Sequence, residues 1–171
     1  QLARYDGTLP MGDQGLILIP HLAGLGFGVG DGGVIVDQQP LITIAAFHLV
    51  SSAVLGAAGI WHTLRAPKDL SDAEGRAQKF HFDWSDAKQL TFILGHHLIF
   101  LGLGAIAFVE WAKRHGIYDS TLGAVRRVEP NIDLGMVWGY QANFLSISSL
   151  EDVMGGHAVL AFILTIGGVW H

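Results

Sequence analysis

Two pairs of histidines in this sequence share one spacing, and each pair could hold metal cofactors at two depths along a helix. His48 and His62 are separated by thirteen residues, as are His157 and His171. Fourteen helical positions give a rise of about 21 Å and leave the two side chains about 40° apart around the axis. Neutral imidazole is a good axial ligand for haem iron, for zinc or for the magnesium of a chlorin. The two stretches also share residues between their histidines: Val50 and Val159, Leu55 and Leu164, Gly59 and Gly168, and Trp61 and Trp170.

The composition indicates that these histidines lie in membrane-spanning helices. Of the 171 residues, 50% are hydrophobic and only 15% are charged, whereas about a quarter of the residues in a soluble domain are charged. Apolar runs of about 20 residues are long enough to cross a bilayer as helices. We therefore predict an all-α membrane protein with spans over residues 41–64 and 89–112. A third span begins at residues 154–171, and this run is too short to cross by itself, so we expect the chain to be a fragment of a longer protein.

The positions of lysine and arginine predict how the spans are oriented. Segment 65–88 carries five Lys or Arg residues, the longer segment 113–153 carries four, and segment 1–40 carries only Arg4. Because basic residues favour the cytoplasmic side, we expect 65–88 to be cytoplasmic and 1–40 and 113–153 to lie on the opposite, lumenal side. The first and third spans then run parallel, and the second span is antiparallel to both. This arrangement places the four histidines of the two pairs in two layers.

Two cofactors fit these layers on the chemistry of imidazole alone. A two-haem cytochrome b would use His48 with His157 and His62 with His171 as axial pairs, and it would carry electrons. Chlorophyll magnesium is usually five-coordinate, so each histidine would hold its own pigment. The haem interpretation leaves His97, in the middle of the second span, without a role, whereas the chlorophyll interpretation gives it one. A membrane subunit with no cofactor is the third possibility.

Four segments of the chain carry a resemblance to a known family. The segments are LARYDGTLPMGDQGLILIPHLAGLGFGVG at 2–30, HLVSSAVLGAAGIWHTLRAP at 48–67, TFILGHHLIFLG at 91–102 and LEDVMGGHAVLAFILTIGGVWH at 150–171. They are similar to the six-helix chlorophyll-binding antenna family, which includes the smaller core antenna of photosystem II, the iron-stress-induced chlorophyll protein and the prochlorophyte chlorophyll-binding (Pcb) proteins. The resemblance is greatest to a Pcb-type accessory antenna, and it covers the middle part of the six-helix antenna fold.

The resemblance implies a light-harvesting antenna that spans the thylakoid membrane several times and is not an enzyme. Such a protein binds chlorophyll and carotenoid, contacts lipid, and passes excitation to a photosystem core, I or II, beside neighbouring antenna subunits. The implied axial ligands of chlorophyll magnesium are His48, His62, His97, His157 and His171, with His96 as a further candidate. His21 belongs to a family motif outside the spans, and we interpret it as a hydrogen-bonding loop residue. We expect His81 and His115 to be loop residues on the solvent side.

Other functional classes find little support in the sequence. There is no cysteine, and the net charge of -5 argues against nucleic acid as a partner. Gly28–Gly33 fits the dinucleotide pattern G-x-G-x-x-G, but no strand or helix pattern flanks it, so we expect a flexible connection. Glu151 and Asp152 have no nucleophile or base beside them, and we expect them to precede a helix and complement its dipole.

Overall fold

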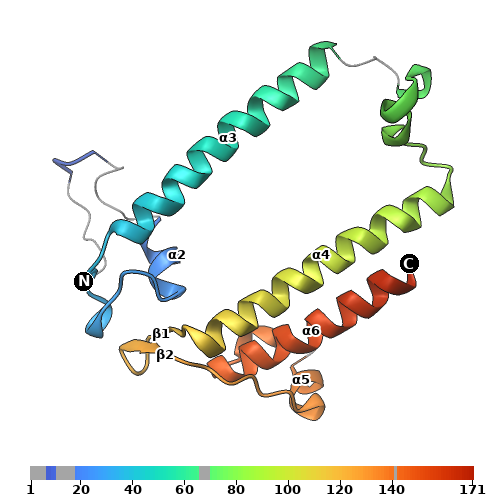
Figure 1. The fold of residues 1–171 in the computed structure, drawn as a ribbon. Helices are drawn as coiled ribbons and strands as arrows, with labels where there is room; N and C mark the ends of the chain where they lie inside the picture. Colours follow the sequence, from blue (N-terminus) through green and yellow to red (C-terminus); the bar gives the residue numbers. More distant parts are fainter. Residues whose placement is uncertain (1–6, 11–17, 66–69, 141) are drawn as a thin grey trace.

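Three long helices dominate the structure, a computed structural model that describes residues 7–10, 18–65, 70–140 and 142–171. They are α3 (Gln39–Arg65), α4 (Ala87–Arg114) and α6 (Leu150–Trp170), and each is long and apolar enough to cross a membrane. Figure 1 shows α3 and α6 running in one direction and α4 in the other. The predicted all-α, antiparallel architecture is confirmed.

The third helix begins earlier than the sequence indicates. We predicted its start at Met154, but α6 begins at Leu150, because the side chain of Ser149 accepts a hydrogen bond from the backbone N–H of Asp152. This cap satisfies one of the free amides of the first turn. The resulting 21 residues correspond to about 31 Å, so the expectation that this run is too short to cross is wrong. Asp86 caps α4 in the same way, accepting from the backbone N–H groups of Lys88 and Gln89.

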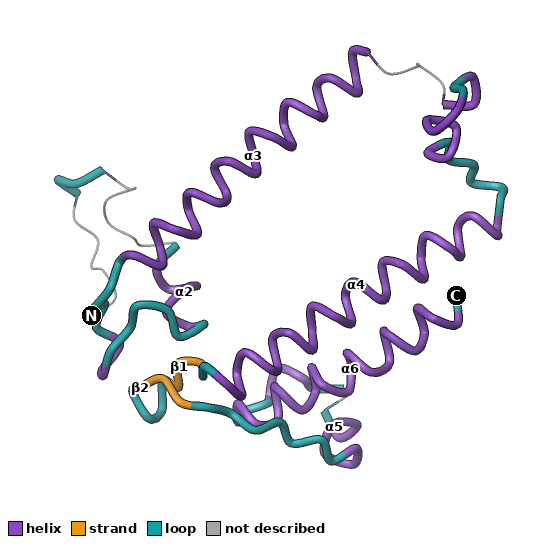
Figure 2. The backbone as a smooth tube through the Cα atoms, in the orientation of Figure 1, coloured by secondary structure: helices purple, strands orange, loops and turns teal. Residues whose placement is uncertain are grey.

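Helices α4 and α6 pack closely along their length (Figure 2). Small residues form the contact: Gly95, Gly102, Ala161 and Gly168 are all buried. A Cβ on Gly102 would collide with the Thr165 hydroxyl, so no larger residue fits there. Small residues let helix backbones approach closely, which is the usual way in which membrane helices associate.

A small hydrophobic core closes one end of the α4–α6 pair. It consists of Val109, Ala112, Ile117, Val128 and Met154. Ile117 begins a two-stranded antiparallel hairpin made of β1 (Ile117–Asp119) and β2 (Ala124–Arg126), which the sequence analysis did not anticipate. The hairpin therefore covers the junction between the end of α4 and the start of α6.

The connections contain further short elements. They are α2 (Ile19–Gly24), η1 (Asp31–Gly33), η2 (Leu70–Asp72), η3 (Gly75–Phe80), α5 (Leu134–Gly139) and η4 (Phe144–Ser146). The G-x-G-x-x-G stretch is not a dinucleotide fingerprint: its second half is η1, which lies between the two residues of an isolated bridge, Val29 and Ile35. Gly28 has a positive φ of 61° and lies against the Asp37 carbonyl, where a Cβ would collide. The stretch is thus a folded turn rather than the flexible connection we expected.

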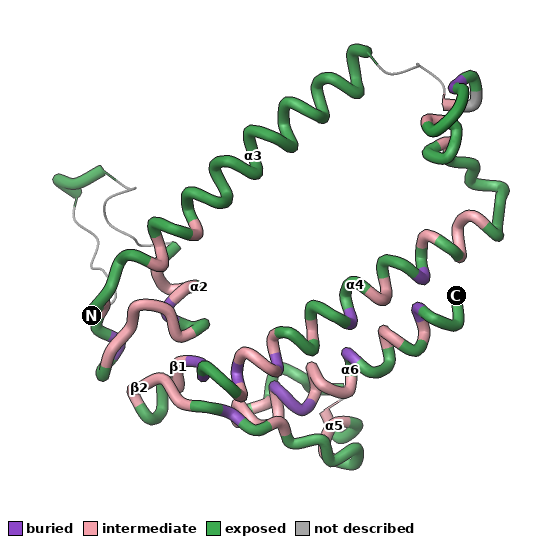
Figure 3. The backbone as a smooth tube through the Cα atoms, viewed as in Figure 1, coloured by how far each residue is buried: buried purple, intermediate pink, exposed green. Residues whose placement is uncertain are grey.

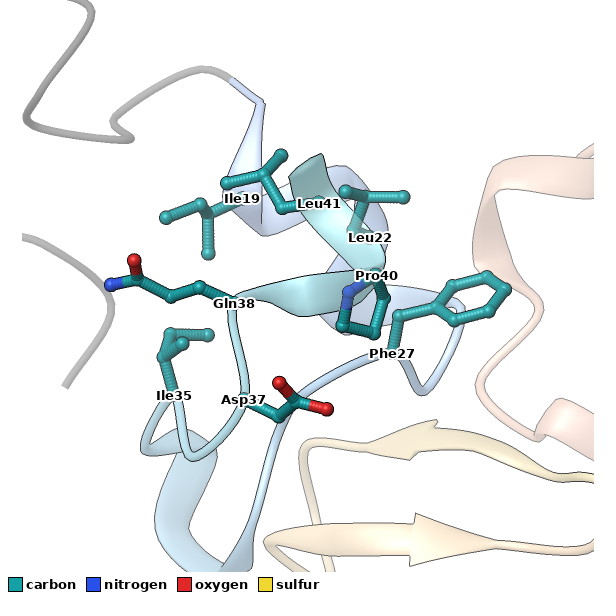
Figure 4. A pocket seen from close by; sticks show the side chains of 8 residues that line it. All are labelled: Ile19, Leu22, Phe27, Ile35, Asp37, Gln38, Pro40 and Leu41. Atoms are coloured by element: carbon teal, nitrogen blue, oxygen red, sulfur yellow. The ribbon is translucent and has the colours of Figure 1, made fainter. Parts of the chain in front are cut away.

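Helix α3 stands apart from the other two long helices. None of its residues is buried, and Figure 3 shows it exposed along nearly its whole length. Its first turn is packed against described residues: Pro40 and Leu41 lie with Ile19 and Leu22 of α2 around a pocket of about 10 Å³ (Figure 4). That volume is about the room of one water molecule, which is too small for a ligand. The side chains around the pocket therefore serve to pack the start of α3 against α2.

Candidate functional site

Four of the candidate histidines make the same hydrogen bond within their own helices. In each, Nδ1 lies within hydrogen-bonding distance of the backbone carbonyl four residues earlier. The pairs are His48 with Ile44 at 2.9 Å, His96 with Phe92 at 2.8 Å, His97 with Ile93 at 2.9 Å, and His157 with Val153 at 2.8 Å.

This hydrogen bond determines the tautomer of each imidazole. A carbonyl oxygen only accepts, so Nδ1 must carry the proton and donate it. In the neutral ring the lone pair is then on Nε2, the atom that points away from the helix backbone. His48, His96 and His97 are exposed and His157 is half-buried, so these lone pairs are accessible from outside the helix bundle. A hydrogen-bond partner on its own helix therefore orients each ring, and metal-ligating histidines commonly have such a partner.

Histidine 171 is oriented from a neighbouring helix instead. Its Nδ1 lies 2.7 Å from the hydroxyl of Thr91 on α4. The backbone of His171 packs against Gly95 of α4. A Cβ added to Gly95 would lie 3.1 Å from the carbonyl carbon of His171. The position of this ring thus depends on the close contact between α4 and α6.

Histidine 62 differs from the other candidates on the long helices. No hydrogen bond from its ring is found within the described residues, and the ring contacts Trp61 edge-on, with centroids 4.9 Å apart. It lines a hollow of about 450 Å³ between the end of α3 and η3. Its tautomer is therefore not fixed by the helix, although His62, like His48, is exposed.

The histidines outside the spans lie in structured positions. His21 is on helix α2, not in a loop as we expected, and its backbone carbonyl accepts from Leu25. His115 caps the end of α4, and its ring stacks on Trp111 with centroids 4.0 Å apart. His81 follows η3, and its carbonyl accepts from the Gln89 side chain.

The structure does not bring the predicted haem pairs together. His48 and His62 are on α3, which Figure 1 shows apart from α6, the helix of His157. A haem with two axial histidines needs both helices to face one macrocycle. Within the described part of the chain, no group of three histidine or carboxylate residues is positioned to hold a metal ion. Single imidazoles on apolar helices instead suit a metal that brings its other ligands with it, as the magnesium of a chlorin does.

A charged cluster holds the hairpin against the start of α6. Arg126 of β2 donates to Asp119 of β1 at 2.6 Å and to Glu151 of α6 at 2.5 Å and 3.2 Å. The hydrogen bond from Arg126 lowers the pKa of Asp119, and the hydrogen bonds to Glu151 and Asp119 raise the pKa of Arg126.

The two acids at the start of α6 have structural partners. Glu151 and Asp152 lie inside the first turn of α6, not before it as we predicted. Asp152 accepts from Asn131 and from the Tyr140 hydroxyl, and the latter hydrogen bond raises the pKa of Tyr140. The acids are thus engaged in holding the connection 113–149 against the helix.

Known proteins resemble this chain over its whole length. It is 56% identical over 173 residues to the divinyl chlorophyll a/b light-harvesting protein PcbA of Prochlorococcus marinus (strain MIT 9313), covering 100% of this chain and 47% of that protein. It is 60% identical to the divinyl chlorophyll a/b light-harvesting protein PcbC of a second Prochlorococcus marinus strain and 58% identical to PcbB of strain NATL2A, covering 49% of each. The chain therefore spans about half the length of the curated relatives it matches.

These relatives are named as light-harvesting proteins, and the two-haem cytochrome interpretation finds no support among them. The Photosystem II protein family matches residues 1–171. This match over the whole chain, with which the three apolar helices agree, shows that the chain belongs to the Photosystem II protein family.

Proposed function

We propose that this protein is a light-harvesting antenna that binds chlorophyll through single axial imidazoles. The observation that carries the proposal is the repeated hydrogen bond from Nδ1 to the carbonyl four residues earlier. It leaves four Nε2 lone pairs directed away from apolar helices. The relatives, which carry divinyl chlorophyll a/b in their names, support the same conclusion.

The proposed magnesium ligands are the five histidines expected from the sequence together with one neighbour. They are His48, His62, His97, His157 and His171, with His96 as a sixth. His96 and His97 are adjacent, so their rings point about 100° apart around α4, and both have the hydrogen bond that fixes the ligand tautomer. His21 stays a weaker candidate, because it is on a short helix outside the long apolar helices.

The protein contributes position and environment rather than bond chemistry. Bound chlorophyll would absorb light and pass excitation to its neighbours. The helices orient the rings of His48, His96, His97 and His157 through backbone hydrogen bonds, and the apolar side chains around them would exclude water from bound pigment. Exposed apolar residues on α3, such as Phe47, Leu49 and Leu55, would contact lipid or pigment rather than water.

The proposal also covers the cellular location, the membrane orientation and the partners of the protein. We infer a multi-pass protein of the thylakoid membrane, with segment 65–88 on the cytoplasmic side and segments 1–40 and 113–153 on the lumenal side. We also infer that it binds carotenoid and that it transfers energy to a photosystem core, beside other antenna subunits. The excess of lysine and arginine in 65–88 supports the orientation.

An absorption spectrum of the purified protein tests the function. Strong red chlorin bands that dithionite does not alter are the expected result. A sharp band that appears on reduction would identify a haem, and a colourless preparation would contradict both interpretations. His97→Leu should lose one pigment per protein while the helices still insert. His81→Leu, which changes a histidine outside the long helices, is the control and should keep the wild-type pigment content.

A further inference from the structure

The hollow at the end of α3 carries two arginine side chains that the proposed pigment ligands do not use. Its volume is about 450 Å³. Two arginines lie on its lining, together with one histidine and four apolar or aromatic residues. These residues are Arg65, Arg76, His62, Trp61, Leu70, Ala77 and Phe80.

The two arginines of the hollow have no carboxylate partner within the described part of the chain. Arg114 and Arg126, by contrast, both form ion pairs. Arg65 ends α3 and Arg76 lies on η3, so two separate elements bring two positive charges to one apolar hollow. Uncompensated guanidinium groups beside apolar walls favour an anion as ligand. Guanidinium binds tetrahedral oxyanions through two parallel hydrogen bonds.

The surroundings of the hollow favour a lipid over a free anion. Trp61 is 57% exposed and lies near the end of a candidate membrane span, and Phe80 is 77% exposed and lines the same hollow. Aromatic residues in that position are typical of the boundary between bilayer and water. Trp84, further along the same connection, is 81% exposed. The polar connection 70–86 thus carries large apolar surfaces that a bilayer would cover.

We propose that this hollow binds an anionic membrane lipid. The phosphate or sulfonate of its headgroup lies between Arg65 and Arg76, and its glycerol and upper acyl chain lie along Trp61 and Phe80. Basic pockets at the cytoplasmic ends of membrane helices are suited to such headgroups. The lipid does not need the Nε2 lone pair of His62, so the site is independent of the proposed antenna function. A lipid bound there would border the pigment proposed for His62.

Retention of lipid by the full-length, pigmented protein tests this site. The protein is equilibrated in mixed micelles with equal amounts of phosphatidylglycerol and phosphatidylcholine, washed, and its retained lipids are counted by mass spectrometry. We expect retained phosphatidylglycerol to exceed phosphatidylcholine. Retention of phosphatidylglycerol should fall about ten-fold in R65Q/R76Q, because both charge-assisted contacts are lost. Arg76→Gln alone should also reduce it, and Arg76→Lys should restore part of it.

The matched control is K79Q/K88Q, which removes the same charge from the same side of the protein but does not touch the hollow. It should retain phosphatidylglycerol as the wild type does. Equal loss in this control, no preference for phosphatidylglycerol in the wild type, or displacement of the lipid by inorganic phosphate would each overturn the proposal. Loss of a pigment with unchanged lipid in R65Q/R76Q would also overturn it, since a pigment would then fill the hollow. A colourless wild-type protein that retains the lipid would support this site and contradict the antenna function.

Discussion

Gly95 of α4 and Gly168 of α6 lie back to back, and the carbonyl oxygen of each is 2.6 Å from where a Cβ on the other would stand. No side chain fits between the two backbones at this point. The contact determines how closely α4 and α6 approach. It also places His171 beside Thr91, because Gly95 packs against the backbone of His171.

Gly95→Ala should destabilise the helix pair, although alanine ordinarily stabilises a helix by about 1 kcal/mol relative to glycine. The added methyl group collides with backbone, which does not yield as a flexible side chain would, and overpacking of this kind costs about 1–3 kcal/mol. Gly104→Ala is the control on the same helix, because a Cβ there meets nothing within 4 Å. Thermal unfolding followed by circular dichroism should show a lower Tm for Gly95→Ala and an unchanged or higher Tm for Gly104→Ala. A similar response of both variants would contradict the contact.

Thr91→Val should weaken the proposed pigment site at His171 without removing the ligand. The hydroxyl of Thr91 is the partner of His171 Nδ1, and loss of the hydrogen bond that orients a ligating histidine weakens metal binding about 10–100-fold. Pigment retained during detergent titration measures the effect. Thr63→Val serves as the control, because its hydroxyl donates only to the Gly59 carbonyl. Full pigment retention in Thr91→Val would show that the hydroxyl does not support the ligand.

Arg126→Gln should detach the hairpin from α6. Arg126 is the common donor to Asp119 and Glu151, and its side chain is 27% exposed. Removing a charged partner from such a group costs about 1–3 kcal/mol, and we expect that fall in the free energy of unfolding by denaturant titration. Arg114→Gln removes an ion pair whose arginine is 84% exposed, and about 0.5 kcal/mol or less should be lost. If both variants lose the same amount, the cluster at Arg126 is no stronger than a surface pair.

Acid should weaken this cluster only below the ordinary pKa range of aspartate. The hydrogen bond from Arg126 lowers the pKa of Asp119 in the folded protein. A carboxyl group of this kind stabilises the fold fully above its unfolded pKa of about 3.9, and the contribution is lost as the pH falls through the folded pKa. The difference in Tm between wild type and Asp119→Asn should therefore stay constant from about pH 7 to about pH 5 and shrink below about pH 4. A difference that stays constant on acidification below about pH 4 would show that the pKa is not lowered.

The long helices could be predicted from the sequence because their signal is local. Each contains an apolar run interrupted mainly by histidine, and the ends fall near Arg65, Ala87 and Arg114. Helix α6 begins four residues before the predicted start, because Ser149 caps it and its first turn includes the charged Glu151 and Asp152, which interrupt the apolar pattern. The sequence places the candidate histidines on the helices, but it does not show which ring nitrogen carries the proton. That depends on the rotamer of each ring, which determines the carbonyl that Nδ1 reaches.

The hairpin was not predicted because its stability depends on partners distant in the sequence. Its strands have three residues each, too few for a periodic pattern. A signal was nevertheless present: Gly116 and Gly123 have positive φ values of 98° and 77°, and the Asp119 side chain accepts from the backbone of Thr121 and Leu122 to form the turn. The pairing of Arg126 with Glu151, 25 residues away, appears in no local pattern.

The hydrogen bond that orients His48, His96, His97 and His157 makes each proposed ligand a self-contained unit of five residues. The acceptor is a backbone carbonyl, which every residue possesses, so it does not depend on the side chain four positions earlier. A new site of this kind would thus need a single substitution to histidine on an outward-facing position of any apolar helix. A ligand oriented from a second helix, like His171, requires two helices to change together. Evolution could therefore add or relocate sites along α3 and α4 one codon at a time.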